Sequence, residues 1–161
     1  MSDTLHAAIE ELRSAFPPHL LDVRMAFDQW GRTYLDAAAF HVGAQGKRWD
    51  ELPASFLEFH HDAPLFLGWP VIVDVIPAYL AVALRRAPEL DMLPAFLVST
   101  LTRGVDSNAT RFDAQFAQTS LAQRSAIAHA LEAWEQSTSD SDRRHQIRAS
   151  LNSYWLPGRS T

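Results

Sequence analysis

Residues 63–84 read APLFLGWPVIVDVIPAYLAVAL and form the most apolar stretch of the chain. A run of 22 residues is long enough to span a bilayer. Asp74, Gly68 and three prolines argue against a span, because a charge or a break in the helix is costly in lipid. We therefore expect this stretch to form the centre of a hydrophobic core.

Two local structures fit this stretch. VIVDVI has the β-branched content of a strand, and Pro70 and Pro77 bound it as the ends of a strand are often bounded. PAYLAVALRR, in contrast, has a helical pattern. A single short strand would find no partner elsewhere in the chain, so we predict two short helices, one entering at Pro70 and one at Pro77.

Helical spacing of apolar residues also marks both ends of the chain. Residues 5–16 carry an apolar residue every three or four positions, with Asp3 as the expected cap and Pro17-Pro18 as the stop. Near the other end, Ser120 and Gln123 spell a capping box ahead of a helix. The last predicted helix places Ile147, Leu151, Tyr154 and Trp155 on one face.

Between these ends we predict helices over Thr33–Val42, over Pro53–Ala63, and over 92–101 with a stop at Gly104. Trp49 is expected to anchor the turn before Pro53, residues 19–31 show no clear period, and residues 104–110 are predicted to be a loop. The expected architecture is all-α: a single domain over residues 1–161 with six to eight helices.

Composition narrows the class of protein. The chain has 161 residues, of which 47% are hydrophobic and 20% charged, the balance of an ordinary globular protein. It has no cysteine, which excludes disulfides, iron–sulfur ligation and thiol nucleophiles. The first residues lack the pattern of a secretory signal, so we expect a cytoplasmic protein.

Charge is unevenly distributed along the chain. Residues 1–80 hold 5 basic and 11 acidic residues, a net charge of −6, whereas residues 81–161 have a net charge of +1. An acidic surface repels phosphate, so nucleic acid is not an expected ligand. The arginine pairs at 85–86 and 143–144 are too small to form a basic patch and are expected on solvated helix faces.

The stretch EFHHDAP, residues 58–64, is the strongest candidate for a site. Glu58 and His61 are three residues apart, so on a helix they face the same way, and Glu-x-x-His is half of a carboxylate-bridged metal site. The alternative is a purely structural role. It places His60 in the core, and His61 and Asp62 at a helix C-terminus, where the helix dipole stabilises a histidinium.

A complete metal site needs more ligands than this pair. The nearest related pairs are Asp142 with His145, and His129 with Glu132 in reverse order. The sequence contains neither a Gly-x-Ser-x-Gly elbow nor a glycine-rich phosphate loop. No cofactor is predicted, and an enzyme is the less favoured interpretation.

Asp74 also has two interpretations. It is either an acid near a helix start, where it caps amides or faces solvent, or a buried acid with a raised pKa. The aromatic residues also have two interpretations. Most are expected in the core, and the alternative is that they line a ligand pocket.

Three segments together resemble an uncharacterised bacterial helical domain family: GKRWDELPASFLEFHHDAPLFL, IPAYLAVAL and RFDAQFAQTSLAQRSAIAHALEAW. The resemblance covers roughly residues 33–135. The matching positions are Trp49, His61-Asp62, Pro77-Ala78-Tyr79-Leu80, Phe116, Gln123, Ala126-Ile127 and Leu131. It implies a helical fold and no particular activity.

These observations lead to three hypotheses about function. The first is a protein-binding domain, of immunity or regulatory type, whose acidic half docks a basic partner through complementary charge. The second is a metal-dependent enzyme or metal-binding protein that uses Glu58 and His61. The third is a homodimer with a structural role. Neither a nucleic acid nor a membrane is an expected partner.

Overall fold

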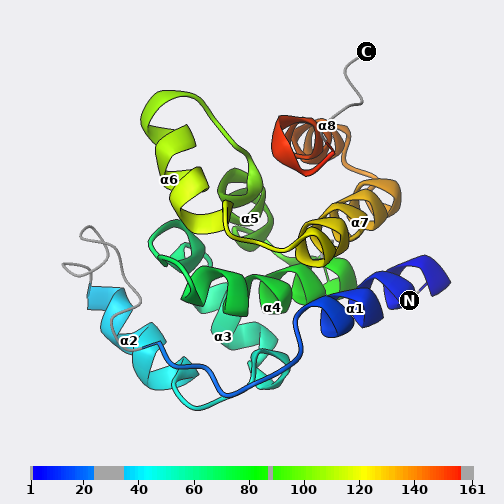
Figure 1. Cartoon of the computed structure of the whole chain (residues 1–161). Coiled ribbons are helices and arrows are strands. Elements are labelled where there is room, and N and C mark those ends of the chain that lie inside the picture. Colours follow the sequence, from blue (N-terminus) through cyan, green and yellow to red (C-terminus); the bar gives the residue numbers. More distant parts are fainter. Residues whose placement is uncertain (1, 24–34, 87–88, 157–161) are drawn as a thin grey trace.

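The computed structural model describes residues 2–23, 35–86 and 89–156, and in these ranges the chain is a bundle of α-helices without a strand (Figure 1). The predicted all-α fold is confirmed. The α-helices are α1 (Asp3–Ala15), α2 (Leu35–Ala44), α3 (Ala54–Phe59), α4 (Val71–Arg86), α5 (Leu93–Leu101), α6 (Asp106–Phe116), α7 (Leu121–Ser137) and α8 (Ser141–Ser150). Shorter turns are η2 (Trp49–Glu51), η3 (Ala63–Leu65) and η5 (Leu151–Trp155).

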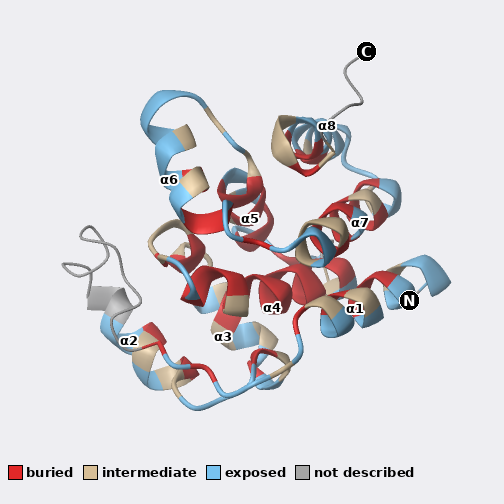
Figure 2. Cartoon of the chain, in the orientation of Figure 1, coloured by how far each residue is buried: buried red, intermediate tan, exposed pale blue. Residues whose placement is uncertain are grey.

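Helix α4 is the centre of the bundle, and it is one helix of 16 residues with Pro77 inside it. The prediction of two short helices is therefore wrong. Proline in a helix interior costs about 3 kcal/mol, because it removes a hydrogen bond and crowds the preceding turn. Thirteen of the α4 residues are buried, including Pro77. Burial on nearly every side of the helix outweighs this local cost (Figure 2).

The other helices surround α4 (Figure 1). Helix α1 packs mainly against α7, and both contact α4. Helix α8 lies against α7 and α5 and continues directly into η5. The buried side chains form one continuous hydrophobic core.

The N-terminal boundaries differ slightly from the predictions. Ser2, rather than Asp3, caps α1, since its hydroxyl accepts a hydrogen bond from the Leu5 amide. Helix α2 begins at Leu35 and extends to Ala44; the predicted start at Thr33 lies outside the described residues, as do most of residues 19–31. Trp49 anchors its turn as predicted: the indole Nε1 donates to the Phe16 carbonyl oxygen at 2.8 Å.

Helix α3 is shorter than predicted, because it ends at Phe59 with His60 as its C-cap. The chain then turns into η3 at Ala63. The predicted loop over residues 104–110 is wrong, because α6 already begins at Asp106. The polar residues of that stretch face solvent, and the buried residues of α6, Phe112, Gln115 and Phe116, come only in its later turns.

The C-terminal predictions agree better with the structure. The capping box of α7 is present: the Ser120 hydroxyl accepts from the Gln123 amide, and the Gln123 side chain accepts from the Ser120 amide. Of the predicted face, Ile147, Leu151 and Trp155 are buried. The indole of Trp155 donates to the Leu101 carbonyl oxygen at 2.6 Å and so ties η5 to α5.

Candidate binding site

The structure brings no further metal ligand to Glu58 and His61. His61 Nδ1 lies 3.0 Å from the backbone oxygen of Glu58, and the imidazole packs on the Phe96 ring. The carboxylate of Glu58 points to Arg86 instead, at 3.9 Å. Across the described ranges, no three His, Asp or Glu side chains come close enough to hold a metal ion.

The two related pairs are also apart from this one. His129 on α7 has its Nδ1 2.8 Å from both carboxylate oxygens of Glu11 on α1, an exposed contact that joins the two helices. Asp142 and His145 are exposed on α8. These contacts are those of helix packing and of a solvated surface.

His60 lies in the core, as the structural interpretation of the EFHHDAP stretch predicts. Its side chain is 4% exposed and stands among the rings of Phe40, Phe56 and Phe59, with centroid distances of 5.6, 4.6 and 4.9 Å. Its backbone oxygen accepts a hydrogen bond of 2.6 Å from the Tyr79 hydroxyl. Burial, with a smaller contribution from the charge of Asp62, raises the pKa of Tyr79 well above its usual value, so this donor keeps its proton.

Asp74 combines parts of both interpretations. It sits in the first turn of α4, with its side chain 29% exposed, and its carboxylate is 3.3 Å from His19 Nε2. Partial burial raises the pKa of Asp74, and His19 offsets part of that increase. The residue is a partly buried acid that contacts an exposed histidine.

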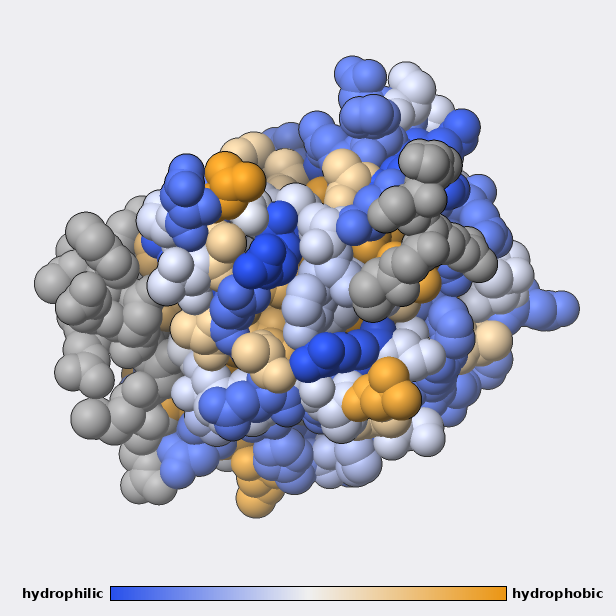
Figure 3. Space-filling model, turned by 45° about the horizontal axis from the view of Figure 1, so that its top comes forward, coloured by the Kyte–Doolittle hydropathy of each residue, from blue (hydrophilic) through white to orange (hydrophobic). Residues whose placement is uncertain are grey.

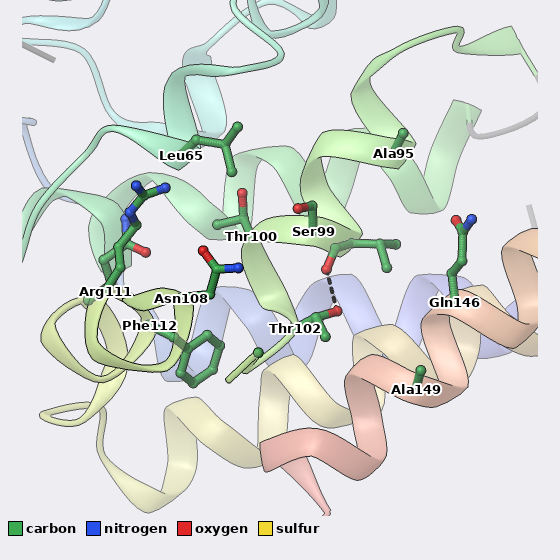
Figure 4. A pocket seen from close by; sticks show the side chains of 13 residues that line it. Leu65, Ala95, Ser99, Thr100, Thr102, Asn108, Arg111, Phe112, Gln146 and Ala149 are labelled. Atoms are coloured by element: carbon green, nitrogen blue, oxygen red, sulfur yellow. Dashed lines mark hydrogen bonds between the residues drawn. The ribbon is translucent and has the colours of Figure 1, made fainter. Parts of the chain in front are cut away.

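A groove between α5, α6 and α8 has a volume of about 470 Å³ (Figure 4). We call it the α5–α6–α8 groove. Its apolar lining is Leu65, Ala95, Val98, Gly104, Phe112 and Ala149. Its polar lining is Ser99, Thr100, Thr102, Asn108, Arg111, Gln115 and Gln146.

Part of this polar lining is committed to the fold. The hydroxyls of Thr100 and Thr102 donate to carbonyl oxygens of their own helix at 2.9 and 2.7 Å. The buried Gln115 amide donates to the carbonyl oxygens of Pro64 and Leu67.

Four other polar residues line the groove: Ser99, Asn108, Arg111 and Gln146. Arg111 and Gln146 lie toward opposite ends (Figure 4).

The chemistry of the groove suits binding. Arg111 is the one charged residue in its lining, and within the described part of the chain it pairs with no carboxylate. The lining contains neither a carboxylate nor an imidazole, the groups that transfer protons in most acid–base sites. On the face seen in Figure 3, strongly apolar residues form small separate areas rather than one broad patch.

Little in the sequence predicted this groove. Asn108 and Arg111 fall in or beside a stretch that looks like a loop, and α5 and α8 are far from it along the chain. The pair Phe112 and Phe116, one helical turn apart and both buried, is the signal from which α6 was recoverable.

The site and the fold define a class: an all-helical domain with an open, largely uncharged groove. No described helix has both the length and the apolar character needed to cross a membrane. Comparison of this chain with family models, with curated proteins and with solved structures found no match.

Proposed function

We propose that this chain is a small protein-binding domain that holds a segment of its partner in the α5–α6–α8 groove. The observation that carries the proposal is the composition of the lining, in which an apolar floor is flanked by neutral hydrogen-bonding side chains. Asn108 and Gln146 offer both amide donors and amide acceptors, which suits the alternating N–H and C=O groups of a polypeptide backbone. Leu65, Ala95 and Ala149, which are partly or fully exposed, supply apolar contact for a partner side chain.

The charge of the chain supports a basic partner. Residues 1–80 have a net charge of −6, and the surface ion pairs made there, such as Glu10 with Arg13 and Asp50 with Arg48, do not alter that net charge. Such a field attracts a basic protein over a distance and need not lie at the point of contact. An acidic, compact partner of this kind fits an immunity-type neutraliser of a basic toxin or a regulatory partner of a basic protein.

The test uses the full chain and the partner it captures, with two variants. Ser99 is exposed in the groove, so Ser99→Trp fills the groove without entering the core. Ser14 is exposed on α1, outside the groove, and Ser14→Trp is the matched control. Calorimetric titration should show affinity weakened by about tenfold or more for Ser99→Trp and unchanged for Ser14→Trp.

Two outcomes would contradict the proposal. One is equal affinity of the Ser99→Trp variant and the unmodified chain for the partner. The other is the finding that the chain associates only with copies of itself, measured by light scattering, which would favour the structural homodimer instead.

A further inference from the structure

The two arginine pairs of the sequence contribute one residue each to a single cavity. Arg85 at the end of α4 and Arg143 in the first turn of α8 are 58 positions apart, and both line a cavity of about 450 Å³. Their neighbours are occupied elsewhere: Arg86 pairs with Glu89 at 3.1 Å, and Arg144 donates to the Thr138 carbonyl oxygen at 2.8 Å. In each pair, therefore, one arginine bonds to another part of the protein and the other lines this cavity.

The two cavity arginines keep most of their donors. Arg85 makes neither an ion pair nor a hydrogen bond to any described residue, and Arg143 gives one N–H to the side chain of Gln146 at 3.0 Å. Guanidinium groups present planar forks of donors that match the oxygens of phosphate. Asp140 is the one carboxylate in the lining, and its Oδ1 already accepts from the amides of Asp142 and Arg143.

Three hydroxyl groups and an apolar wall complete the cavity. Ser137 donates to the Trp134 carbonyl oxygen, while the hydroxyls of Thr138 and Ser139 form no bond to a described residue. The apolar wall comprises Leu5, Leu84, Leu90, Pro94 and Trp134. The lining therefore matches a ligand that combines an anionic group with an apolar portion.

Trp134 gives a second, independent observation. Its indole Nε1 is the one buried side-chain nitrogen or oxygen without a hydrogen-bond partner in the described part of the chain. A buried donor left unpaired costs about 1–3 kcal/mol, so such groups are uncommon in folded proteins and call for an explanation. The residue is 1% exposed and lines the cavity.

We propose that this cavity binds a small organic phosphate, with the phosphate between Arg85 and Arg143 and its apolar portion against Leu84, Leu90 and Pro94. A phosphate monoester carries up to two charges and three strong acceptor oxygens, which two guanidinium forks and two free hydroxyls can satisfy together. The site shares no lining residue with the α5–α6–α8 groove, and one hydrogen bond, from Arg143 to Gln146, joins the two. The proposal does not rest on protein binding in the groove.

The test is a titration of the full chain with phenyl phosphate, in which NMR monitors the tryptophan indole N–H signals. The Trp134→Phe variant identifies the Trp134 signal by its loss. We expect phenyl phosphate to move that signal and to bind more tightly than inorganic phosphate, which lacks the apolar portion, and than benzoate, which has one carboxylate. The Arg85→Gln, Arg143→Gln double variant should bind about tenfold or more weakly, whereas Arg111→Gln, in the groove, should bind normally.

Several results would overturn the site. The first is a Trp134 signal that does not move at saturating phenyl phosphate. The second is a double variant that is folded, as judged by its circular dichroism spectrum, and binds phenyl phosphate as tightly as the unmodified chain. The third is equal affinity of the Arg111→Gln variant and the double variant for phenyl phosphate. Benzoate bound as tightly as phenyl phosphate would overturn the assignment of phosphate, and inorganic phosphate bound as tightly would overturn the role of the apolar wall.

Discussion

At the scale of single residues, the buried side chain of Gln115 joins two distant segments of the chain through hydrogen bonds. Its side chain is 5% exposed, and its Nε2 donates to the carbonyl oxygens of Pro64 and Leu67 at 3.2 and 2.5 Å. Both acceptors belong to the segment that leads from η3 into α4. One amide therefore fixes α6, and with it one wall of the groove, to the middle of the chain.

Gln115→Leu should consequently destabilise the protein. The substitution keeps the apolar bulk but leaves two buried carbonyl oxygens without this donor, which predicts a loss of about 2 kcal/mol in the free energy of unfolding. Urea denaturation measures the change. Gln118→Leu, at an exposed position, is the control and should stay within about 0.5 kcal/mol of the unmodified chain. Equal stability of the two variants would show that the Gln115 bonds contribute nothing.

Asp74 makes stability depend on pH in a defined direction. Because burial raises its pKa in the folded state, the folded chain holds this proton more tightly than the unfolded chain does. The stabilisation from the protonated form is complete below the unfolded pKa and is lost as pH rises through the folded pKa. Near neutral pH the ionised carboxylate is therefore a net cost.

Asp74→Asn should thus be more stable than the unmodified chain at about pH 7, and this advantage should shrink toward about pH 4. Urea denaturation across that range measures it, with Asp91→Asn, at an exposed acid, as the control. An advantage that grows as pH falls would have the wrong sign and would contradict burial as the dominant influence on Asp74.

At the scale of elements, the boundaries that sequence could predict are those set by local chemistry. The α7 capping box needs only Ser120 and Gln123, three residues apart, and the structure contains it as predicted. The single helix α4 was not predictable in this way, because neighbouring helices, and not local preference, keep Pro77 in a helix. The start of α6 was missed because Asp106, with φ at +52°, and the polar residues after it favour turns as readily as a first helical turn.

The capping box predicts the effect of one substitution on α7. Ser120→Ala removes the acceptor for the Gln123 amide, at 3.2 Å, and should cost about 1 kcal/mol in the free energy of unfolding. Ser125→Ala, within the same helix, should have little effect or a slight stabilising one, because alanine is the better helix former. Thermal unfolding of both variants measures the difference, and a Ser120→Ala variant as stable as Ser125→Ala would contradict a role for the cap.

The candidate sites show why function is harder to predict than fold. The Glu58 and His61 spacing was visible in the sequence, but the structure directs the two side chains to different partners. The α5–α6–α8 groove and the arginine cavity combine residues from separate helices. Only the packing of the whole bundle brings them together.

At the scale of the whole molecule, charge asymmetry predicts how association responds to salt. The net charge of −6 over residues 1–80 should speed encounter with a basic partner at low ionic strength. Raising the salt concentration from about 0.05 M to about 0.5 M should slow association by about tenfold, because the Debye length falls below the size of the contact. Surface plasmon resonance measures this, and the dissociation rate should change much less. Association rates that are independent of salt would exclude a basic partner steered by this charge.

The most direct test of the central claim is amide hydrogen exchange of the chain with its partner bound. If the α5–α6–α8 groove holds the partner, exchange should slow in residues 102–111, which run from the end of α5 into α6 along the edge of the groove. Exchange in α2, outside the groove, should stay the same. Slowing confined to α1, α2 and α3, with residues 102–111 unchanged, would contradict the groove as the binding site.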